Sequence, residues 1–207
     1  MRLLLVRHGE TALNAARILQ PADTPLSERG HAQAAALARR LAGQPITQLW
    51  SSDLPRAWQT AEPIARACDL TIRPWPALQE RNFGDLRGRP YDSLGVDPLA
   101  MAEAPPAGES IETFEARIDA ALDAALVAAR GESGCIVLVS HGLVIHSLLA
   151  RRIARAPGVA LPPRIANTSI SAISAIDPGT PPRATLIDCT AHLAGASADD
   201  PLALSGG

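Results

Sequence analysis

Two histidines, each placed just after an apolar run, are the side chains most able to do chemistry. Arg7-His8-Gly9 follows the apolar residues 3–6, and His141-Gly142 follows the apolar residues 135–139 and one serine. A neutral imidazole is a competent nucleophile, and a guanidinium group matches the oxygens of a phosphate. Either histidine alone could follow a strand by chance. Their recurrence, with Arg7 beside the first, favours one shared chemical site.

A third turn of the same kind begins at Ser51 and contains Arg56. It follows the apolar pair 49–50, and Pro55 places Arg56 in the first turn of a helix. In an open parallel sheet, ligands bind beyond the carboxyl ends of the strands, where helix N-termini present free N–H groups. Three such turns bring two arginines, two histidines and several backbone donors to one point, and phosphate is the anion that these groups suit.

Glu80 is the best-placed candidate for a proton donor. It lies in the stretch 78–84 (LQERNFG), at the start of a segment rich in Gly and Pro. The alkoxide that leaves a phosphoester must be protonated, and a carboxylic acid that burial keeps protonated can do this. A cage that only binds phosphate would need neither a nucleophile nor an acid.

A metal-dependent hydrolase is a further alternative, with His8, His141, His146 and Glu10 as the ligands. The sequence has no paired-histidine helix motif, and His146 falls five residues after His141, off the same helical face. We therefore expect no metal and no other cofactor.

Length and composition limit the remaining classes of protein to which the chain could belong. A chain of 207 residues is expected to form one domain over residues 1–190, with a small, polar and loosely ordered tail over 191–207. A net charge of −2 and 3% aromatic residues disfavour nucleic acid as a partner. No segment has the roughly 20 apolar residues that a membrane helix needs, and the N-terminal run is too short for a signal peptide, so we expect a soluble, cytoplasmic protein.

Apolar runs alternate with Ala-rich stretches of helical spacing, which predicts an α/β fold. Strands are expected at residues 3–6, 49–50, 136–139, 169–176 and 184–189. Helices are expected from 27 to 40 or 41, over 55–68 and 111–130, and from 142 to a point before 157. Residues 81–109 are expected to form an inserted active-site loop. Three widely spaced cysteines, Cys68, Cys135 and Cys189, argue against a disulfide framework and are expected to be small buried hydrophobic residues. His31 and His192 are expected to be surface or loop residues, and the three tryptophans are expected to pack in the core or at its boundary: Trp50, Trp58 and Trp75.

Taken together, these residues resemble the histidine phosphatase superfamily (branch 1), the phosphoglycerate-mutase-like proteins. The order and spacing of the matching segments carry the resemblance more than any one segment does. They are Arg7-His8-Gly9-Glu10-Thr11 with Asn14, residues 23–27 with Gly30, residues 51–54 with Arg56, Ala57 and Thr60, Glu80 with Gly84 and Gly88, Gly108-Glu109-Ser110, and Ser140-His141-Gly142.

The resemblance implies a three-layer αβα sandwich around a mostly parallel central sheet. It also implies that His8 becomes phosphorylated, that Glu80 is the proton donor and later the base that activates water, and that no metal is needed. The phosphoryl group would be held by Arg7, Arg56 and His141, with further substrate contacts at Gly9, Asn14, Gln20 and Gly142. This chain has one residue fewer than similar phosphatases in the turn that follows Gln20, which puts the rim of the site there in question.

The stretch 80–88 is also similar to a segment of cofactor-dependent phosphoglycerate mutases. A mutase must retain a bisphosphorylated intermediate, which requires additional cations. Residues 91–110 contain no Arg or Lys, and Asn82 and Phe83 stand where those mutases have His and Tyr. Hydrolysis of a small phosphomonoester is the favoured reaction, with mutase activity and a non-catalytic phosphate-binding module as the alternatives.

The natural substrate and the oligomeric state stay open at this point. Sugar phosphates, phosphoglycerate derivatives, intermediates of cofactor synthesis and phosphoproteins are all candidates. Five residues of the 81–109 loop are candidates for shaping specificity, but a sequence cannot aim side chains on an irregular loop: Arg81, Arg87, Arg89, Tyr91 and Met101.

Overall fold

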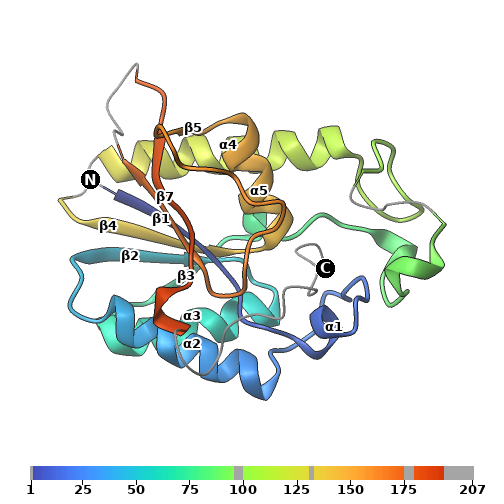
Figure 1. Cartoon of the computed structure of the whole chain (residues 1–207), viewed down its shortest axis with the longest axis horizontal. Helices are drawn as coiled ribbons and strands as arrows, with labels where there is room; N and C mark the ends of the chain where they lie inside the picture. Colours follow the sequence, from blue (N-terminus) through green and yellow to red (C-terminus); the bar gives the residue numbers. More distant parts are fainter. Residues whose placement is uncertain (1, 96–99, 131–132, 175–179, 194–207) are drawn as a thin grey trace.

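A computed structural model describes residues 2–95, 100–130, 133–174 and 180–193. Over these ranges a sheet of seven strands forms, in the order β3-β2-β4-β1-β6-β7-β5 (Figure 1). Strand β6 is antiparallel to its neighbours β1 and β7, and the other neighbouring pairs are parallel. The strands are β1 (Arg2–Arg7), β2 (Ile46–Ser51), β3 (Ile72–Pro74), β4 (Cys135–Ser140), β5 (Ala154–Arg155), β6 (Ile170–Ser174) and β7 (Arg183–Cys189).

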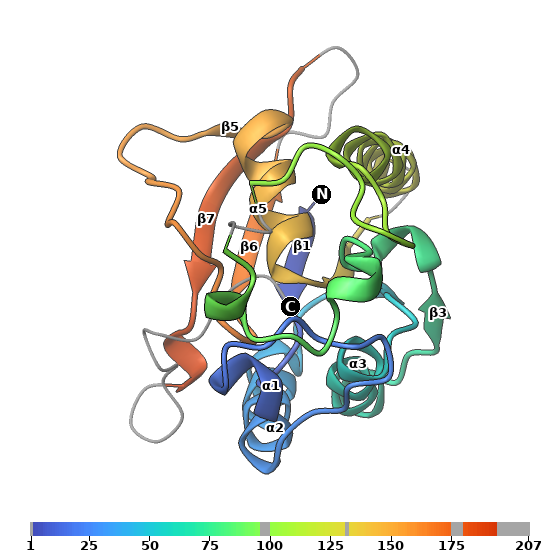
Figure 2. The same ribbon diagram turned by 90° about the vertical axis from the view of Figure 1, so that its right-hand side faces the viewer.

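Helices cover both faces of the sheet, as Figures 1 and 2 show. Helices α2 (Glu28–Leu41) and α3 (Pro55–Cys68) pack on one face, and α4 (Ile111–Arg130) and α5 (Gly142–Arg151) pack on the other. The short helix α1 (Ala12–Ala15) and the 3-10 turns η1 (Pro76–Leu78), η2 (Gly84–Leu86), η3 (Tyr91–Ser93) and η4 (Ala191–Leu193) lie in the connections. The predicted α/β class and three-layer αβα architecture are confirmed.

The central strands are continuously apolar because they are buried on both faces. In β4, Ile136 and Leu138 belong to the core beneath α4 and α5, whereas Val137 and Val139 belong to the core beneath α2 and α3. Parallel pairing aligns Arg7 of β1 with Ser140 of β4. The carboxyl ends of these strands therefore meet at one edge of the sheet.

The helix boundaries follow the predicted caps. Ser27 caps α2 by accepting a hydrogen bond from the Gly30 backbone N–H, and Pro55 is the first residue of α3. The strand predicted over 169–176 is shorter, because only Ile170–Ser174 pairs and residues 175–176 lie outside the described ranges. Strands β3 and β5 were not predicted, since two or three mostly exposed residues leave no periodic pattern.

The beginning of the predicted tail departs from the expectation. Ala191–Leu193 forms η4, with Leu193 buried against the rest of the fold. His192 is half-buried rather than a surface residue, and its ring nitrogens lie 3.2 Å from Arg40 Nη1 and 3.1 Å from Thr168 Oγ1. Burial, with the nearby charge of Arg40, lowers its pKa to about 4. The rest of the tail, 194–207, lies outside the described residues.

The three cysteines are free, as predicted, with Cys135 buried and the other two half-buried. His31 is exposed as expected, whereas Trp58 is only half-buried. Trp50 packs edge-on against Trp75, with ring centroids 4.7 Å apart. Within the described ranges, no helix combines the length and apolar character required to cross a bilayer.

We expect that replacing Gly30 with alanine will destabilise the fold and the site together. A Cβ at this position would lie 2.1 Å from the Glu10 carbonyl oxygen, so the backbone next to His8 would have to move. Overpacking of this kind typically costs about 1–3 kcal/mol. Urea denaturation should show a lower free energy of unfolding for Gly30→Ala and no comparable loss for His31→Ala, at an exposed position of the same helix turn. Equal stability of the two variants would contradict the prediction.

Candidate active site

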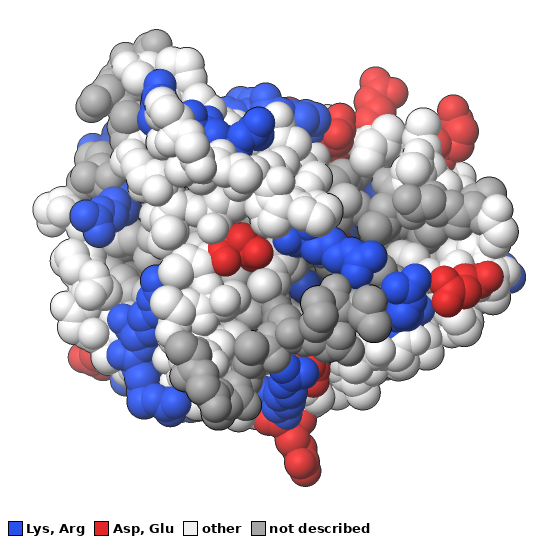
Figure 3. All heavy atoms as spheres, in the orientation of Figure 1, with Lys and Arg blue, Asp and Glu red and all other residues white. Residues whose placement is uncertain are grey.

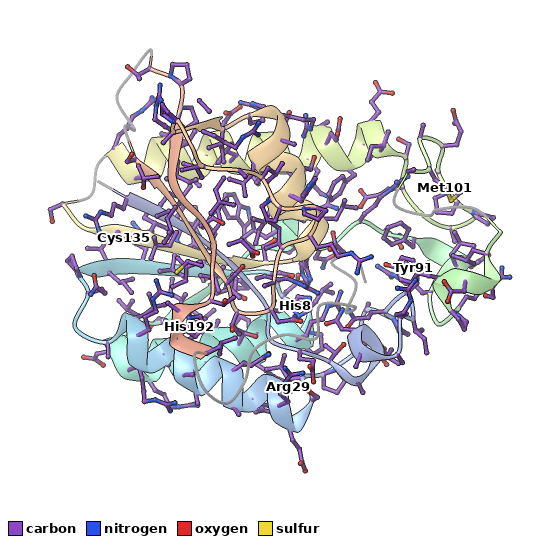
Figure 4. All side chains as sticks on the ribbon, in the orientation of Figure 1. His8, Arg29, Tyr91, Met101, Cys135 and His192 are labelled. Carbon is purple, nitrogen blue, oxygen red and sulfur yellow. The ribbon has the colours of Figure 1, made fainter. Side chains whose placement is uncertain are left out.

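The predicted chemical residues meet at the carboxyl edge of the sheet. His8 follows β1 and His141 follows β4, and their ring centroids lie 5.1 Å apart. Figure 4 shows His8 at the end of the sheet, beside the loop connections. Arg7 and Arg56, from β1 and the first turn of α3, are fully buried with them. The structure thus brings together the four side chains that the sequence separates by up to 134 positions.

Hydrogen bonds fix the tautomer of His8. Its Nδ1 lies 2.7 Å from the carbonyl oxygen of Gly9, which can only accept, so Nδ1 carries the proton. Nε2 makes no hydrogen bond to any described residue. Burial, and then the positive charges of Arg7 and Arg56, hold the pKa of His8 well below its usual value. The ring is therefore neutral, and the lone pair on Nε2 is available to an electrophile.

His141 faces this ring in a similar electrostatic environment. Its Nε2 lies 2.8 Å from Ser52 Oγ, at the end of β2, and its Nδ1 has no hydrogen-bond partner among the described residues. Burial lowers its pKa well below the usual value, with Arg56, His8 and Arg7 as further causes. Two neutral imidazoles thus lie among buried cations, an arrangement that suits an anionic ligand.

The two arginines each donate to a backbone carbonyl. Arg7 Nη1 donates to the Ile165 carbonyl, and Arg56 Nη1 donates to the Pro21 carbonyl at 3.3 Å. Burial lowers the pKa of Arg56 to about 10, so the group stays charged at neutral pH. Buried like charges raise the free energy of the empty site, and a bound dianion would neutralise them.

Glu80 is buried as well, with 3% of its surface exposed. Its Oε1 accepts from the Arg81 backbone N–H at 3.0 Å, and its Oε2 accepts from the Leu143 N–H at 3.1 Å, in the first turn of α5. Burial raises its pKa, against the opposing effect of these two hydrogen bonds and of the charges of Arg56 and Arg7. A raised pKa favours the protonated form of Glu80, which is the form that a general acid requires.

A partly buried ion pair positions the backbone on both sides of Glu80. Arg117 of α4 donates to the Ala77 and Gln79 carbonyls at 3.0 and 2.9 Å, and Arg117 Nη2 pairs with Glu109 Oε1 at 2.6 Å. Glu109 Oε1 also accepts from the Asn82 N–H at 2.8 Å. The sequence flags Glu109 through the 108–110 segment, but nothing distinguishes Arg117 from the other arginines of this Arg-rich chain.

Two buried amides line the same region. Asn14 follows the α1 cap residue Thr11, and its side-chain amide makes no hydrogen bond to a described residue. Gln20 is also buried: its Oε1 accepts from Thr11 Oγ at 2.7 Å, and its Nε2 is left without a described partner. Both amides thus have donors available for a ligand, and their predicted substrate contacts stay predictions.

The predicted substrate contact of Gly9 stays a prediction. Its backbone N–H donates to Thr60 Oγ1 at 2.9 Å, so this donor is already engaged. What requires a glycine here is close packing, because a Cβ would lie 2.7 Å from the Gly30 carbonyl oxygen. Gly142 is the first residue of α5, and the N-terminus of that helix faces the site through the Leu143 N–H that holds Glu80.

Two of the four ligands of the alternative metal site, Glu10 and His146, are engaged with other partners. Glu10 pairs with Arg29 Nη1 at 2.7 Å and accepts from Ser27 Oγ at 3.0 Å. His146 is half-buried on α5 and hydrogen-bonds to the Pro162 backbone. Among the described residues, no three His, Cys, Asp or Glu side chains form a group spaced to hold a metal ion.

Most of the candidate specificity residues of the 81–109 loop have structural partners. Arg81 is buried and donates hydrogen bonds to the Met101, Glu103 and Glu109 carbonyls. These bonds join the beginning of the loop to its end. Tyr91 packs with Leu19 and Phe83 in a small satellite cluster. Figure 4 shows Tyr91 and Met101 in the loop region to the right of His8.

Comparison with known proteins identifies the family of this chain. The model of the histidine phosphatase superfamily (branch 1) matches residues 3–184. A probable phosphoglycerate mutase of Yersinia pestis is 42% identical over 160 residues, which is 72% of this chain and 74% of that protein.

Solved structures show the same relationship. A mycobacterial glucosyl-3-phosphoglycerate phosphatase, solved with VO3, is 30% identical with a TM-score of 0.76, covering 91% of this chain and 98% of the other. A putative alpha-ribazole-5'-P phosphatase of Escherichia coli is 28% identical with a TM-score of 0.76, covering 92% and 97%. With its two His-Gly turns and buried arginines at one sheet edge, this chain belongs to the histidine phosphatase superfamily, branch 1.

Proposed function

We propose that this protein is a metal-independent phosphomonoester hydrolase that acts through a phosphohistidine intermediate at His8. The observation that carries the proposal is the state of the His8 ring: Nδ1–H is held by the Gly9 carbonyl, and Nε2 is unprotonated and free of described partners. A binding module would gain nothing from a ring held in this way. Glu80, with its raised pKa, supplies the acid, and the charges of Arg7 and Arg56 act on it as they act on His8.

The first half-reaction transfers the phosphoryl group to the enzyme. The Nε2 lone pair of His8 forms a bond to phosphorus as the bond from phosphorus to the ester oxygen breaks. The leaving oxygen takes the proton of Glu80, which yields the alcohol, phosphohistidine and a glutamate anion. In the second half-reaction a water molecule attacks phosphorus, Glu80 takes its proton, the P–N bond breaks, and phosphate leaves with His8 neutral again.

The other predicted residues stabilise charge on the transferred group. Phosphoryl transfer has a loose transition state, so positioning and electrostatics supply most of the catalysis. Arg7, Arg56 and His141 would contact the non-bridging oxygens, with Asn14 as a further donor. The loss of one such preorganised donor typically costs about 3 kcal/mol, or roughly a hundredfold in rate.

A phosphate-release assay with 4-nitrophenyl phosphate, with and without excess EDTA, tests the proposal. Equal hydrolysis in both conditions would support metal-independent chemistry at His8. Complete loss of activity in EDTA, restored by a divalent metal, would contradict it. An absence of turnover with any phosphomonoester would favour a non-catalytic phosphate-binding module.

Phosphoglycerate mutase activity is the second candidate, favoured by the 42% identical relative that carries this name. Two observations disfavour it. Asn82 is used within the loop, where its Nδ2 donates to the Ala107 carbonyl and its Oδ1 accepts from the Gly84 N–H. Phe83 is buried in the satellite cluster. Conversion of 3-phosphoglycerate to 2-phosphoglycerate with a bisphosphoglycerate primer, faster than phosphate release, would make the mutase the correct assignment.

The proposed partner is a small phosphorylated metabolite, with no nucleic acid, membrane, metal or cofactor involved. The relatives named above suggest phosphoglycerate derivatives and nucleotide-loop phosphates as the first compounds to test. A cytoplasmic location stays a prediction from the sequence.

A further inference from the structure

Within the described part of the chain, backbone groups alone hold the carboxyl group of Glu80. Its two oxygens accept from the N–H groups of Arg81 and Leu143, at 3.0 and 3.1 Å, and no described side chain hydrogen-bonds to it. Residues 79–83 form neither helix nor strand, so no regular hydrogen-bond pattern fixes their path. The direction in which the carboxyl group points therefore depends on the other contacts that hold this irregular stretch.

Arg117 of α4 holds the stretch that precedes Glu80. Its Nη1 donates to two carbonyl oxygens, that of Ala77 at 3.0 Å and that of Gln79 at 2.9 Å. The second carbonyl belongs to the peptide bond that joins Gln79 to Glu80. A charged donor makes a stronger hydrogen bond than a neutral one, so this nitrogen fixes the chain where it enters Glu80.

Glu109 holds the stretch that follows Glu80, and it holds Arg117 as well. Its Oε1 lies 2.6 Å from Arg117 Nη2 and accepts from the Asn82 N–H at 2.8 Å. The Glu109 N–H donates back to the Asn82 carbonyl at 2.9 Å. Asn82 directly follows Arg81, whose N–H holds the Glu80 carboxyl group. The pair of Arg117 and Glu109 thus fixes the chain on both sides of the acid.

The contacts of Arg117 set it apart more than its charge does. Figure 3 shows arginine side chains gathered in the middle of one face of the molecule, so positive charge is common on that surface. The side chains of Arg117 and Glu109 are only 25% and 13% exposed. Water therefore competes less for this pair than for a salt bridge on the surface. Both terminal nitrogens of Arg117 are engaged by protein acceptors, so we assign the residue no contact with the substrate.

We propose that Arg117, held by Glu109, is a positioning residue that aims the carboxyl group of Glu80 at the leaving oxygen of the substrate. The inference rests on the proposed hydrolysis, in which Glu80 gives that oxygen its proton. Proton transfer needs the acid within about 2.6–3.2 Å of the oxygen. A displacement of about 1 Å can cost about 10²-fold in rate, so the loss of these backbone contacts should slow the steps that use the proton of Glu80.

The test replaces Arg117 with methionine, which keeps much of the length of the side chain and removes every N–H donor. With glycerol 3-phosphate, whose leaving alkoxide needs a proton, kcat should fall about 10- to 100-fold while KM changes less than about threefold. With 4-nitrophenyl phosphate, whose leaving group departs without a proton, the rate of the initial nitrophenolate burst should change less than about threefold.

The difference between the two substrates separates positioning from a charge effect. Burial, and then four nearby charges of which Arg117 is the last, lower the pKa of His141. A charge effect on the phosphoryl site would change the transfer step of both substrates alike. A displaced acid slows only the transfer in which the leaving oxygen takes a proton.

Combination with Glu80→Gln shows whether the two residues act on the same steps. If Arg117 works through Glu80, the double variant Glu80→Gln/Arg117→Met should turn over glycerol 3-phosphate within about threefold of Glu80→Gln alone. If the losses of the two single variants multiply instead, Arg117 acts independently of the acid and the inference is wrong.

Two conservative variants and a matched control complete the design. Arg117→Lys keeps the charge but not the planar fork, so it should recover part of the activity that Arg117→Met loses. Glu109→Gln keeps an acceptor oxygen without the charge, so it should show the same dependence on the leaving group with a smaller loss. Arg151 matches Arg117 in burial, with 31% of its side chain exposed, and it pairs with Glu115 of α4 at 2.9 Å. It lies in the last turn of α5, whereas the first turn holds Glu80, so Arg151→Gln should keep wild-type rates on both substrates.

Thermal melting of each variant checks the fold, and if Arg117→Met does not fold, Arg117→Lys and Glu109→Gln carry the same comparison. Equal losses on both substrates would show that Arg117 serves the fold or the phosphoryl group, and wild-type rates throughout would show that it has no role. Either result overturns the inference alone, because Glu80→Gln still tests the acid. If Glu80→Gln itself shows no dependence on the leaving group, the proposed function loses its acid and the inference falls with it.

Discussion

Replacing His8 with alanine is expected to lower phosphate release by at least about 10⁴-fold and to abolish the acid-labile phosphoenzyme. The variant keeps Arg7, Arg56 and Glu80, so substrate can still bind, but the covalent route has no acceptor atom. The effect should exceed that of any single arginine substitution, because an arginine only stabilises charge on a route that still exists. The measurement is rapid acid-free quenching of a reaction with ³²P-labelled substrate, followed by separation of labelled protein.

His31→Ala provides the matched control, since this exposed histidine lies outside the site. It should retain wild-type turnover and labelling. A labelled, acid-labile intermediate that persists in His8→Ala would show that another residue accepts the phosphoryl group. Unlabelled wild-type protein during turnover at several quench times would favour direct attack by water.

Replacing Glu80 with glutamine is expected to lower kcat for an alkyl phosphate by about 10²- to 10⁴-fold, because the alkoxide then leaves without a proton. The loss should be much smaller for the first step with 4-nitrophenyl phosphate, since 4-nitrophenolate is a good leaving group. Dephosphorylation also uses Glu80, so a burst of nitrophenolate with accumulated phosphoenzyme should appear. Stopped-flow absorbance measures both. Glu112→Gln, an exposed acid on α4, is the control and should behave as wild type.

The pH profile gives a second readout of Glu80. Burial raises the pKa of this acid, which must be protonated for the first step, so wild-type activity should fall as the pH rises through that raised value. Burial and two cations lower the pKa of His8, which must be neutral, so activity should fall on the acid side only well below the usual histidine range. The alkaline decline should be absent from Glu80→Gln. A decline of the same position and size in the variant would assign it to another group.

The sequence predicted the parts of the site that follow buried strands. Residues 3–6 and 136–139 are apolar without alternation because both faces of β1 and β4 are covered, and this pattern locates the ends where His8 and His141 lie. Pro55 then fixes the start of α3, and so the position of Arg56. At these positions the local sequence pattern agrees with the three-dimensional fold, so the positions could be predicted from the sequence alone.

The contacts that hold the catalytic groups could not be predicted in the same way. Arg117 reaches the backbone beside Glu80 across 38 to 40 positions, and Asn167 donates to the His8 carbonyl across 159. No spacing rule marks such pairs, because they depend on how an irregular loop folds onto the end of the sheet. The hydrogen bond from the Gly9 N–H to Thr60, on a distant helix, is a further contact of this kind.

The half-buried His192 has a consequence for where this molecule can be shortened. Its ring meets Thr168 Oγ1, and the Thr168 backbone N–H donates to the carbonyl oxygen of His8 at 3.3 Å. The match to the superfamily ends at residue 184. The contacts that support the backbone of His8 extend eight positions further, to His192. Trimming the protein at the family boundary would remove most of β7 and the contact of His192 with Thr168, the residue whose N–H holds the backbone carbonyl of His8.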